Sequence, residues 1–194
     1  MTNILAVSGK LKHGKDSYCN FIIEELKKRN FQREIYKTAF ANVIKEAALH
    51  LFPQLDPQVY YGPSELRNTP IEGFINPETG KQLIARDPLT MIGKWGRLCN
   101  PNCWVYATTY NFPKLIEEGK LIILSDCRFI NEANHLHNMG AKIIRIIRPD
   151  VGFTTNDPSE IDLDDYKDFD KIIINDTMEN LRKAAIEVIN EYIL

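Results

Sequence analysis

Short apolar runs alternate along this chain with longer segments whose apolar residues recur at helical spacing. The predicted strands are residues 4–8, 35–39, 121–125, 142–147 and 171–174. The predicted helices are residues 16–29, 41–52, 88–98, 102–111, 113–118 and 131–139, with a last helix from residue 177. Because strands that alternate with helices usually form a parallel sheet covered by helices, this pattern predicts an α/β fold.

The length of 194 residues, with 44% hydrophobic residues, predicts one domain over residues 1–194. Residues 53–82 are rich in Pro, Gly, Asn and Tyr and have no clear periodicity. A long stretch of this kind is usually functional, so we expect an insertion there on the substrate side. The polar, acidic residues 149–170 are expected to form a lid-like loop.

The charge balance excludes some classes of partner. The net charge is -2, so the chain has no overall attraction for nucleic acid or anionic membranes, and we expect neither as a partner. The first residues lack a basic segment followed by a long apolar run, and no run approaches the length of a bilayer span. We therefore expect a cytoplasmic protein, with its oligomeric state, including a homodimer, left open.

A glycine-bearing loop follows the first predicted strand and precedes a predicted helix. Its sequence GKLKHGK, from Gly9 to Lys15, satisfies the pattern G-x-x-x-x-G-K. Glycines let successive backbone N–H groups point at phosphate oxygens, and the helix N-terminus adds its positive dipole end. Lys15 is then expected to reach the β- and γ-phosphates of ATP. The residues predicted to bind ATP are Gly9, Lys12, His13, Gly14, Lys15, Asp16 and Ser17.

Asp16 departs from the common form of this loop, which has Ser or Thr at that position to bind Mg²⁺. A carboxylate can still serve the metal, directly or through water, because Mg²⁺ prefers oxygen ligands. The alternative is that Asp16 only balances the dipole of the helix that it opens.

A second group of charged residues follows the predicted strand 121–125. Asp126 and Arg128 come directly after that strand, and Glu132 lies one turn into the next helix. Ligands of open α/β sheets bind at the carboxyl ends of strands, so these are expected site residues. We expect Asp126 to organise magnesium or a substrate hydroxyl, Arg128 to hold a phosphate, and Glu132 to orient Arg128 or the substrate. The alternative is a surface trio that caps a helix.

These two stretches resemble the deoxynucleoside monophosphate kinases of bacteriophages. The sequence GKDS at residues 14–17 is similar to that family's G-K-D-[ST] loop, and DCRFINEA at residues 126–133 is similar to its D-x-R-F-x-N-E-A motif. Ser17 replaces the commoner Thr, and Ile130 stands where proline is usual. Weaker likenesses are spread over nearly the whole chain and include Phe40, Lys45, Arg86, Trp104 and the pairs Ser159-Glu160 and Asn175-Asp176.

The resemblance implies a three-layer P-loop kinase fold of the nucleoside monophosphate kinase type. It also implies transfer of the γ-phosphate of ATP to a (deoxy)nucleoside 5′-monophosphate with Mg²⁺. Lys15, Asp16, Asp126 and Arg128 would be catalytic, and Asp16, Ser17 and Asp126 would hold the metal. The predicted substrate-binding residues are Phe40, Lys45, Arg86, Trp104, Asp126, Arg128 and Glu132.

The roles within this set rest on side-chain chemistry. Phosphoryl transfer depends on positioning and charge neutralisation, which favours arginines such as Arg86 at the acceptor phosphate and Arg148 over the phosphates. Phe40 and Trp104 offer flat surfaces for a base, although such residues are more often in the core.

Two other functions remain open at this point. Animal-type phosphomevalonate kinases are also similar in length and in a G-K-D loop, so another small-molecule kinase is one alternative. A non-catalytic nucleotide-binding module on the same fold is the second. The sequence does not determine the preferred base or sugar.

Overall fold

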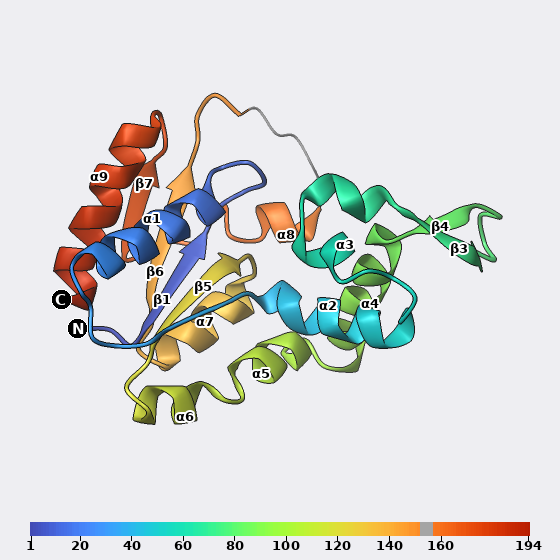
Figure 1. The fold of residues 1–194 in the computed structure, drawn as a ribbon, viewed down its shortest axis with the longest axis horizontal. Helices are drawn as coiled ribbons and strands as arrows, with labels where there is room; N and C mark the ends of the chain where they lie inside the picture. Colours follow the sequence, from blue (N-terminus) through green and yellow to red (C-terminus); the bar gives the residue numbers. More distant parts are fainter. Residues whose placement is uncertain (152–156) are drawn as a thin grey trace. The chain divides into compact units, whose positions relative to one another are not determined.

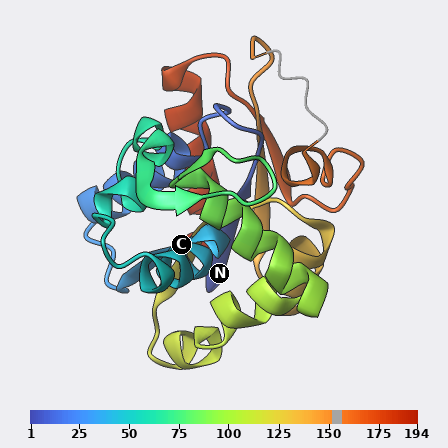
Figure 2. The same cartoon turned by 90° about the vertical axis from the view of Figure 1, so that its right-hand side faces the viewer.

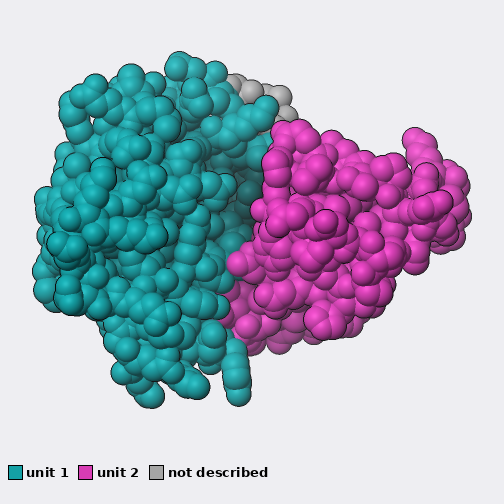
Figure 3. All heavy atoms as spheres, in the orientation of Figure 1, with its two compact units in different colours: residues 1–40, 109–194 teal, residues 41–108 magenta. Residues whose placement is uncertain are grey.

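The computed structural model describes residues 1–151 and 157–194. Its backbone contacts group the chain into two compact units, Met1–Phe40 with Thr109–Leu194 (unit 1) and Ala41–Thr108 (unit 2), coloured separately in Figure 3. The prediction of one domain stays a prediction, because this grouping does not test whether either unit folds alone.

Unit 1 contains a five-stranded parallel sheet of order β2-β5-β1-β6-β7. The strands are β1 (Ile4–Ser8), β2 (Ile35–Thr38), β5 (Leu121–Cys127), β6 (Lys142–Ile147) and β7 (Lys171–Ile174). The helices of unit 1 are α1 (Lys15–Lys28), α6 (Phe112–Glu117), α7 (Ile130–Asn138), α8 (Pro158–Ile161), α9 (Met178–Val188) and η2 (Ile189–Ile193). The predicted α/β fold, with a parallel sheet flanked by helices, is confirmed. Its finer assignment to the P-loop class stays a prediction.

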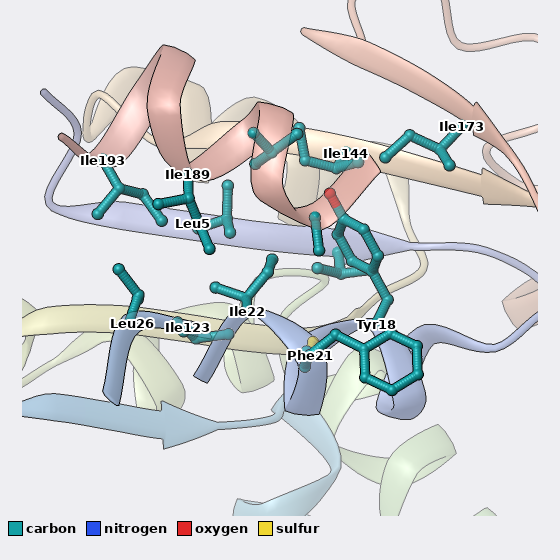
Figure 4. Close-up of a cluster of buried hydrophobic side chains, with 14 of the residues drawn as sticks. Leu5, Tyr18, Phe21, Ile22, Leu26, Ile123, Ile144, Ile173, Ile189 and Ile193 are labelled. Carbon is teal, nitrogen blue, oxygen red and sulfur yellow. The ribbon is translucent and has the colours of Figure 1, made fainter. Parts of the chain in front are cut away.

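One face of this sheet packs against α1, α9 and η2, and the contact forms the main core (Figure 4). Leu5, Ile123 and Ile144 point to this face from three neighbouring strands, and they meet Ile22 of α1 and Ile189 of η2. These side chains are removed from water, which is the main stabilising contribution to the fold. Burial therefore fixes α1 against the sheet, and with α1 the position of the loop before it.

Alternate residues of the strands point to the opposite face of the sheet, because side chains alternate along a strand. On β6, Ile144 and Ile146 belong to the main core, whereas Ile143 and Arg145 point to the other side. α7 packs against β6. The two ends of the chain lie side by side in unit 1 (Figures 1 and 2), joined by a hydrogen bond from the Thr2 N–H to the carbonyl of Tyr192.

Unit 2 is mainly helical and carries an antiparallel pair of strands. Its elements are α2 (Phe40–Leu51), α3 (Gln58–Tyr61), η1 (Ser64–Asn68), β3 (Pro70–Ile75), β4 (Gln82–Ile84), α4 (Arg86–Cys99) and α5 (Cys103–Thr109), the first and last of which reach one residue into unit 1. The expected insertion, residues 53–82, contains α3, η1 and β3. Elements of four to six residues are too short to show a period in the sequence, which explains why no pattern predicted them.

The expected lid-like loop, residues 149–170, falls partly outside the described residues, since 152–156 are not described. Its described part includes α8. None of the helices in 1–151 and 157–194 combines the length and the apolar character that crossing a bilayer requires.

Candidate functional site

The carboxyl ends of β1, β5 and β6 lie at the same edge of the sheet in unit 1. Ser8, the last residue of β1, is paired with Cys127 on β5 and with Arg145 on β6. β5 is two residues longer than the predicted strand, so Asp126 lies within it and Arg128 directly follows it. The loop after β1 and these charged residues are therefore neighbours, although more than 100 positions separate them in the sequence. Open α/β sheets bind ligands at such an edge.

Two glycines of the loop occupy positions that another residue would not fit. Gly14 has φ +93°, and a Cβ atom there would lie 2.5 Å from Nδ2 of Asn175. Gly9 has φ +153°, and its Cβ would lie 2.7 Å from the carbonyl oxygen of Ile146. Only glycine combines a positive φ with such close packing. The loop is thus wound tightly against the ends of β6 and β7.

Lys15 is the first residue of α1, and its side chain turns back into the loop. Its Nζ donates to the carbonyl of Lys10 at 2.8 Å, and the residue is only 8% exposed. Burial, followed by the positive charge of Arg128, lowers the pKa of Lys15 to about 8. A negative ligand beside the Lys15 ammonium would stabilise its charged form, because burial disfavours that charge.

Other residues of the loop anchor it or face solvent. The Nδ2 group of Asn175 donates to the carbonyl of His13 at 2.9 Å, and the Nδ1 atom of His13 lies 3.3 Å from the backbone nitrogen of Arg148. Burial lowers the pKa of His13, which favours the neutral ring. Lys12 and Asp16 are exposed, Lys12 with φ +62°, and Ser17 is half-buried.

Asp126 and Glu132 both bind backbone N–H groups. The Oδ1 atom of Asp126 accepts from the N–H of Phe40 at 2.6 Å. The Oε2 atom of Glu132 accepts from the N–H groups of Arg128 at 2.7 Å and Phe129 at 3.1 Å. Burial and the charge of Asp126 raise the pKa of Glu132 to about 8. Glu132 thus fixes the backbone turn between β5 and α7.

The guanidinium of Arg128 has a different carboxylate partner. It pairs with Glu160 of α8, and the other carboxylate oxygen of Glu160 accepts from the N–H of Leu11 at 2.7 Å. Glu132 binds the backbone N–H of Arg128, whereas Glu160 pairs with its side chain. The expected role of Glu132 in orienting Arg128 stays a prediction. The sequence around Arg128 did not indicate that its partner would be Glu160, which lies 32 positions further along the chain.

A cavity of about 470 Å³ adjoins the loop in unit 1. Its wall includes Lys10, His13, Arg145 and Arg148, together with Tyr166 and Phe169. Arg145 is buried, donating to Ser8 Oγ at 3.0 Å and pairing with Asp164 at 3.1 Å. The volume is within the range of small-molecule sites.

The remaining predicted substrate residues are placed as follows. Phe40 is 3% exposed, and its backbone contacts Asp126. Trp104, in unit 2, is 8% exposed, donates Nε1–H to the carbonyl of Gly93 at 3.0 Å and packs on Gly96. A base contact for either ring stays a prediction.

Two polar candidates also lie in unit 2. Lys45 has its Nζ 4.9 Å from the ring centre of Tyr61. Arg86 opens α4 and lies 3.5 Å from the carbonyl of Ser64. The role of both in substrate binding stays a prediction.

Three residues of unit 1 that our site prediction omitted contact the loop directly. They are Glu160, Asp164 and Asn175. The sequence did contain a signal for Glu160 and Asn175, because Ser159-Glu160 and Asn175-Asp176 belong to the weaker likenesses to the phage kinases. Asp164 lies in an acidic stretch with nothing to distinguish it from its neighbours.

Comparisons with known proteins agree with a kinase-like relationship. The chain is 25% identical over 194 residues to a mimivirus protein (Acanthamoeba polyphaga mimivirus) named "Putative deoxynucleotide monophosphate kinase", with 96% of each chain covered. It is 24% identical over 180 residues to "Uncharacterized protein ORF76" of Ictalurid herpesvirus 1, covering 90% of this chain and 62% of the viral protein. No protein-family model matches the chain. The similarity supports a relationship to nucleotide kinases at this coarse level.

Proposed function

We propose that this protein transfers the γ-phosphate of ATP to a (deoxy)nucleoside 5′-monophosphate. The observation that carries the proposal is the meeting of a glycine loop and two charged strand-end residues at one edge of a parallel sheet. Lys15 is buried in that loop, Asp126 is the last but one residue of the neighbouring strand β5, and Arg128 directly follows that strand. The mimivirus relative named "Putative deoxynucleotide monophosphate kinase", aligned over 96% of both chains at 25% identity, supports the choice of substrate class.

We assign a separate role in phosphoryl transfer to each of these residues. The loop N–H groups and the Lys15 ammonium would hold the phosphates of the donor, with the helix dipole of α1 adding to their attraction. Arg128 would grip phosphate oxygens with its planar guanidinium and neutralise the charge that spreads over the transferred group. Glu132 would keep the backbone turn that aims Arg128.

The oxygen donors near the loop fit Mg²⁺. Asp16, Ser17 and Asp126 supply two carboxylates and a hydroxyl, the ligand type that this ion prefers. In the described part of the chain, no group of three or more His, Cys, Asp or Glu residues forms a metal cluster. The proposal needs only one or two carboxylates, because Mg²⁺ completes its shell with water and substrate phosphates. Its chemistry would be to neutralise the negative charge of the phosphates.

The test is turnover with ATP, Mg²⁺ and a panel of acceptors. We expect product with at least one ribo- or deoxyribonucleoside monophosphate. Turnover of phosphomevalonate alone would indicate the other kinase class, and ATP binding without turnover of any acceptor would indicate a non-catalytic module.

Lys15→Ala should lower turnover by about a hundredfold or more, the scale of losing one strong electrostatic stabiliser. Lys28→Ala is the matched control, because Lys28 is an exposed lysine at the other end of α1. Rates with a saturating acceptor would be compared for folded proteins. Equal turnover of both variants would refute the role of the loop.

A further inference from the structure

Glu160 occupies donors that an anionic ligand would use. Its side chain is 9% exposed, and its two oxygens bind the N–H of Leu11, inside the glycine loop, and the guanidinium of Arg128. The charge of Glu160 also acts on Lys15, raising the pKa of that lysine against the dominant effect of burial. The carboxylate therefore lies among the positive groups of the loop.

A second carboxylate of the same segment binds two more cations. The Oδ2 atom of Asp164 lies 2.6 Å from Nζ of Lys10, and its Oδ1 atom lies 3.1 Å from the guanidinium of Arg145. Residues 158–164 thus place two negative groups on the loop and on strand-end arginines. Hydrogen bonds between ions are short and strong, so these contacts dock the segment.

We propose that Leu11 N–H and the Arg128 guanidinium form a phosphoryl-binding subsite that Glu160 fills while no ligand is bound. A phosphate group entering this subsite replaces the Glu160 carboxylate and releases residues 158–164 from the loop. The inference rests on the proposed phosphate-binding role of the loop. It adds that the Glu160 carboxylate competes with the phosphate for the same donors.

The physical reason is that two anions cannot share these donors. An N–H group that donates to Glu160 is not available to a phosphate. A phosphate beside the ionised carboxylate in this half-buried site would also be repelled by its negative charge. A phosphate dianion offers more acceptor oxygens and more charge than a carboxylate. It therefore gains more from Arg128 and Lys15 than Glu160 does, and exchange is favourable.

The experiment uses tripolyphosphate as the probe, because it carries the phosphates of ATP without a base and needs no turnover. Calorimetry should show that Glu160→Gln binds tripolyphosphate about tenfold more tightly than wild type, as the competing charge is gone. Asp165→Asn is the matched control. This substitution removes the charge of an exposed residue of the same region, for which the described structure gives no contact with the loop. The affinity of this variant for tripolyphosphate should stay within about twofold of wild type.

Hydrogen exchange of the wild-type protein gives a second measurement that needs no variant. Tripolyphosphate should speed exchange of the amides in residues 158–165, since their docking contacts are lost. Slower exchange there, or unchanged or weaker binding by Glu160→Gln, would overturn the inference and make Glu160 a fixed partner of Arg128. If Glu160→Gln does not fold, the exchange result decides.

ATP titrations separate this inference from the proposed function. Wild-type protein that binds and turns over ATP while Glu160→Gln gains no affinity would refute only the exchange with Glu160. A wild-type protein that binds neither ATP nor tripolyphosphate would refute both.

Discussion

At the scale of single residues, the chemical state of Lys15 is the most consequential property of the site. Its pKa of about 8, against 10.5 for the free side chain, means that the buried ammonium loses its proton more easily than a surface lysine does. Bound phosphates would stabilise the charged form and raise this pKa.

Phosphate binding should therefore take up a proton above pH 8. Near pH 9 most of the free protein has neutral Lys15, so this residue should take up close to one proton when ATP binds, whereas near pH 6.5, where Lys15 is already charged, it should take up almost none. The affinity should fall as the pH rises above 8. Calorimetry in buffers of different ionisation enthalpy measures the uptake.

The control for this prediction is Lys15→Arg, since a guanidinium stays protonated throughout this range. If that variant binds ATP, its proton uptake at pH 9 should vanish. Uptake that persists in Lys15→Arg would mean that another group titrates. No uptake in wild type would mean that Lys15 is already charged in the free protein at pH 9.

At the scale of elements, the loop between β1 and α1 depends on β7 as much as on its own sequence. Asn175, at the end of β7, holds the carbonyl of His13 and lies directly against Gly14. The loop conformation is thus a product of three elements that only the folded sheet brings together.

Gly14→Ala should destabilise the protein by about 2 kcal/mol or more, because it adds crowding at Asn175 to the cost of a positive φ. Gly119→Ala is the control, since Gly119 also has a positive φ, +76°, but no atom lies within 4 Å of its added Cβ. It should cost about 1 kcal/mol. Urea unfolding measures both, and equal costs would show that the contact with Asn175 is not tight.

At the scale of the whole molecule, the two units differ in how much they bury. The main core of unit 1 joins three central strands with α1, α9 and η2. Ala48, Val59, Tyr60 and Ala85 form a cluster in unit 2 that has far fewer fully buried residues than the main core.

Unit 2 should therefore open at a lower free energy than unit 1. Native-state hydrogen exchange should find the slowest amides in β1, β5 and β6, and faster exchange in α2 and α4, because local stability follows buried apolar contact. Equal exchange free energies in both units would contradict this and would indicate a single cooperative unit.

The sequence by itself determined which residues form the strands and most of the helices of unit 1, but not the order of the strands in the sheet. The predicted strands 4–8, 142–147 and 171–174 have the bounds of β1, β6 and β7, because continuous apolar runs between polar segments leave little choice of which residues are buried. The strand-end positions of Asp126 and Arg128 follow from the same pattern.

Only the tertiary structure decided which distant groups meet at the loop. Glu160 and Asp164 lie about 150 residues from Leu11 and Lys10, and nothing periodic in an acidic stretch says which carboxylate finds which cation. The short elements of unit 2 were likewise invisible, since a helix of four residues shows no period. Local patterns depend on neighbours along the chain, whereas ion pairs of this kind depend on where the sheet places its strand ends.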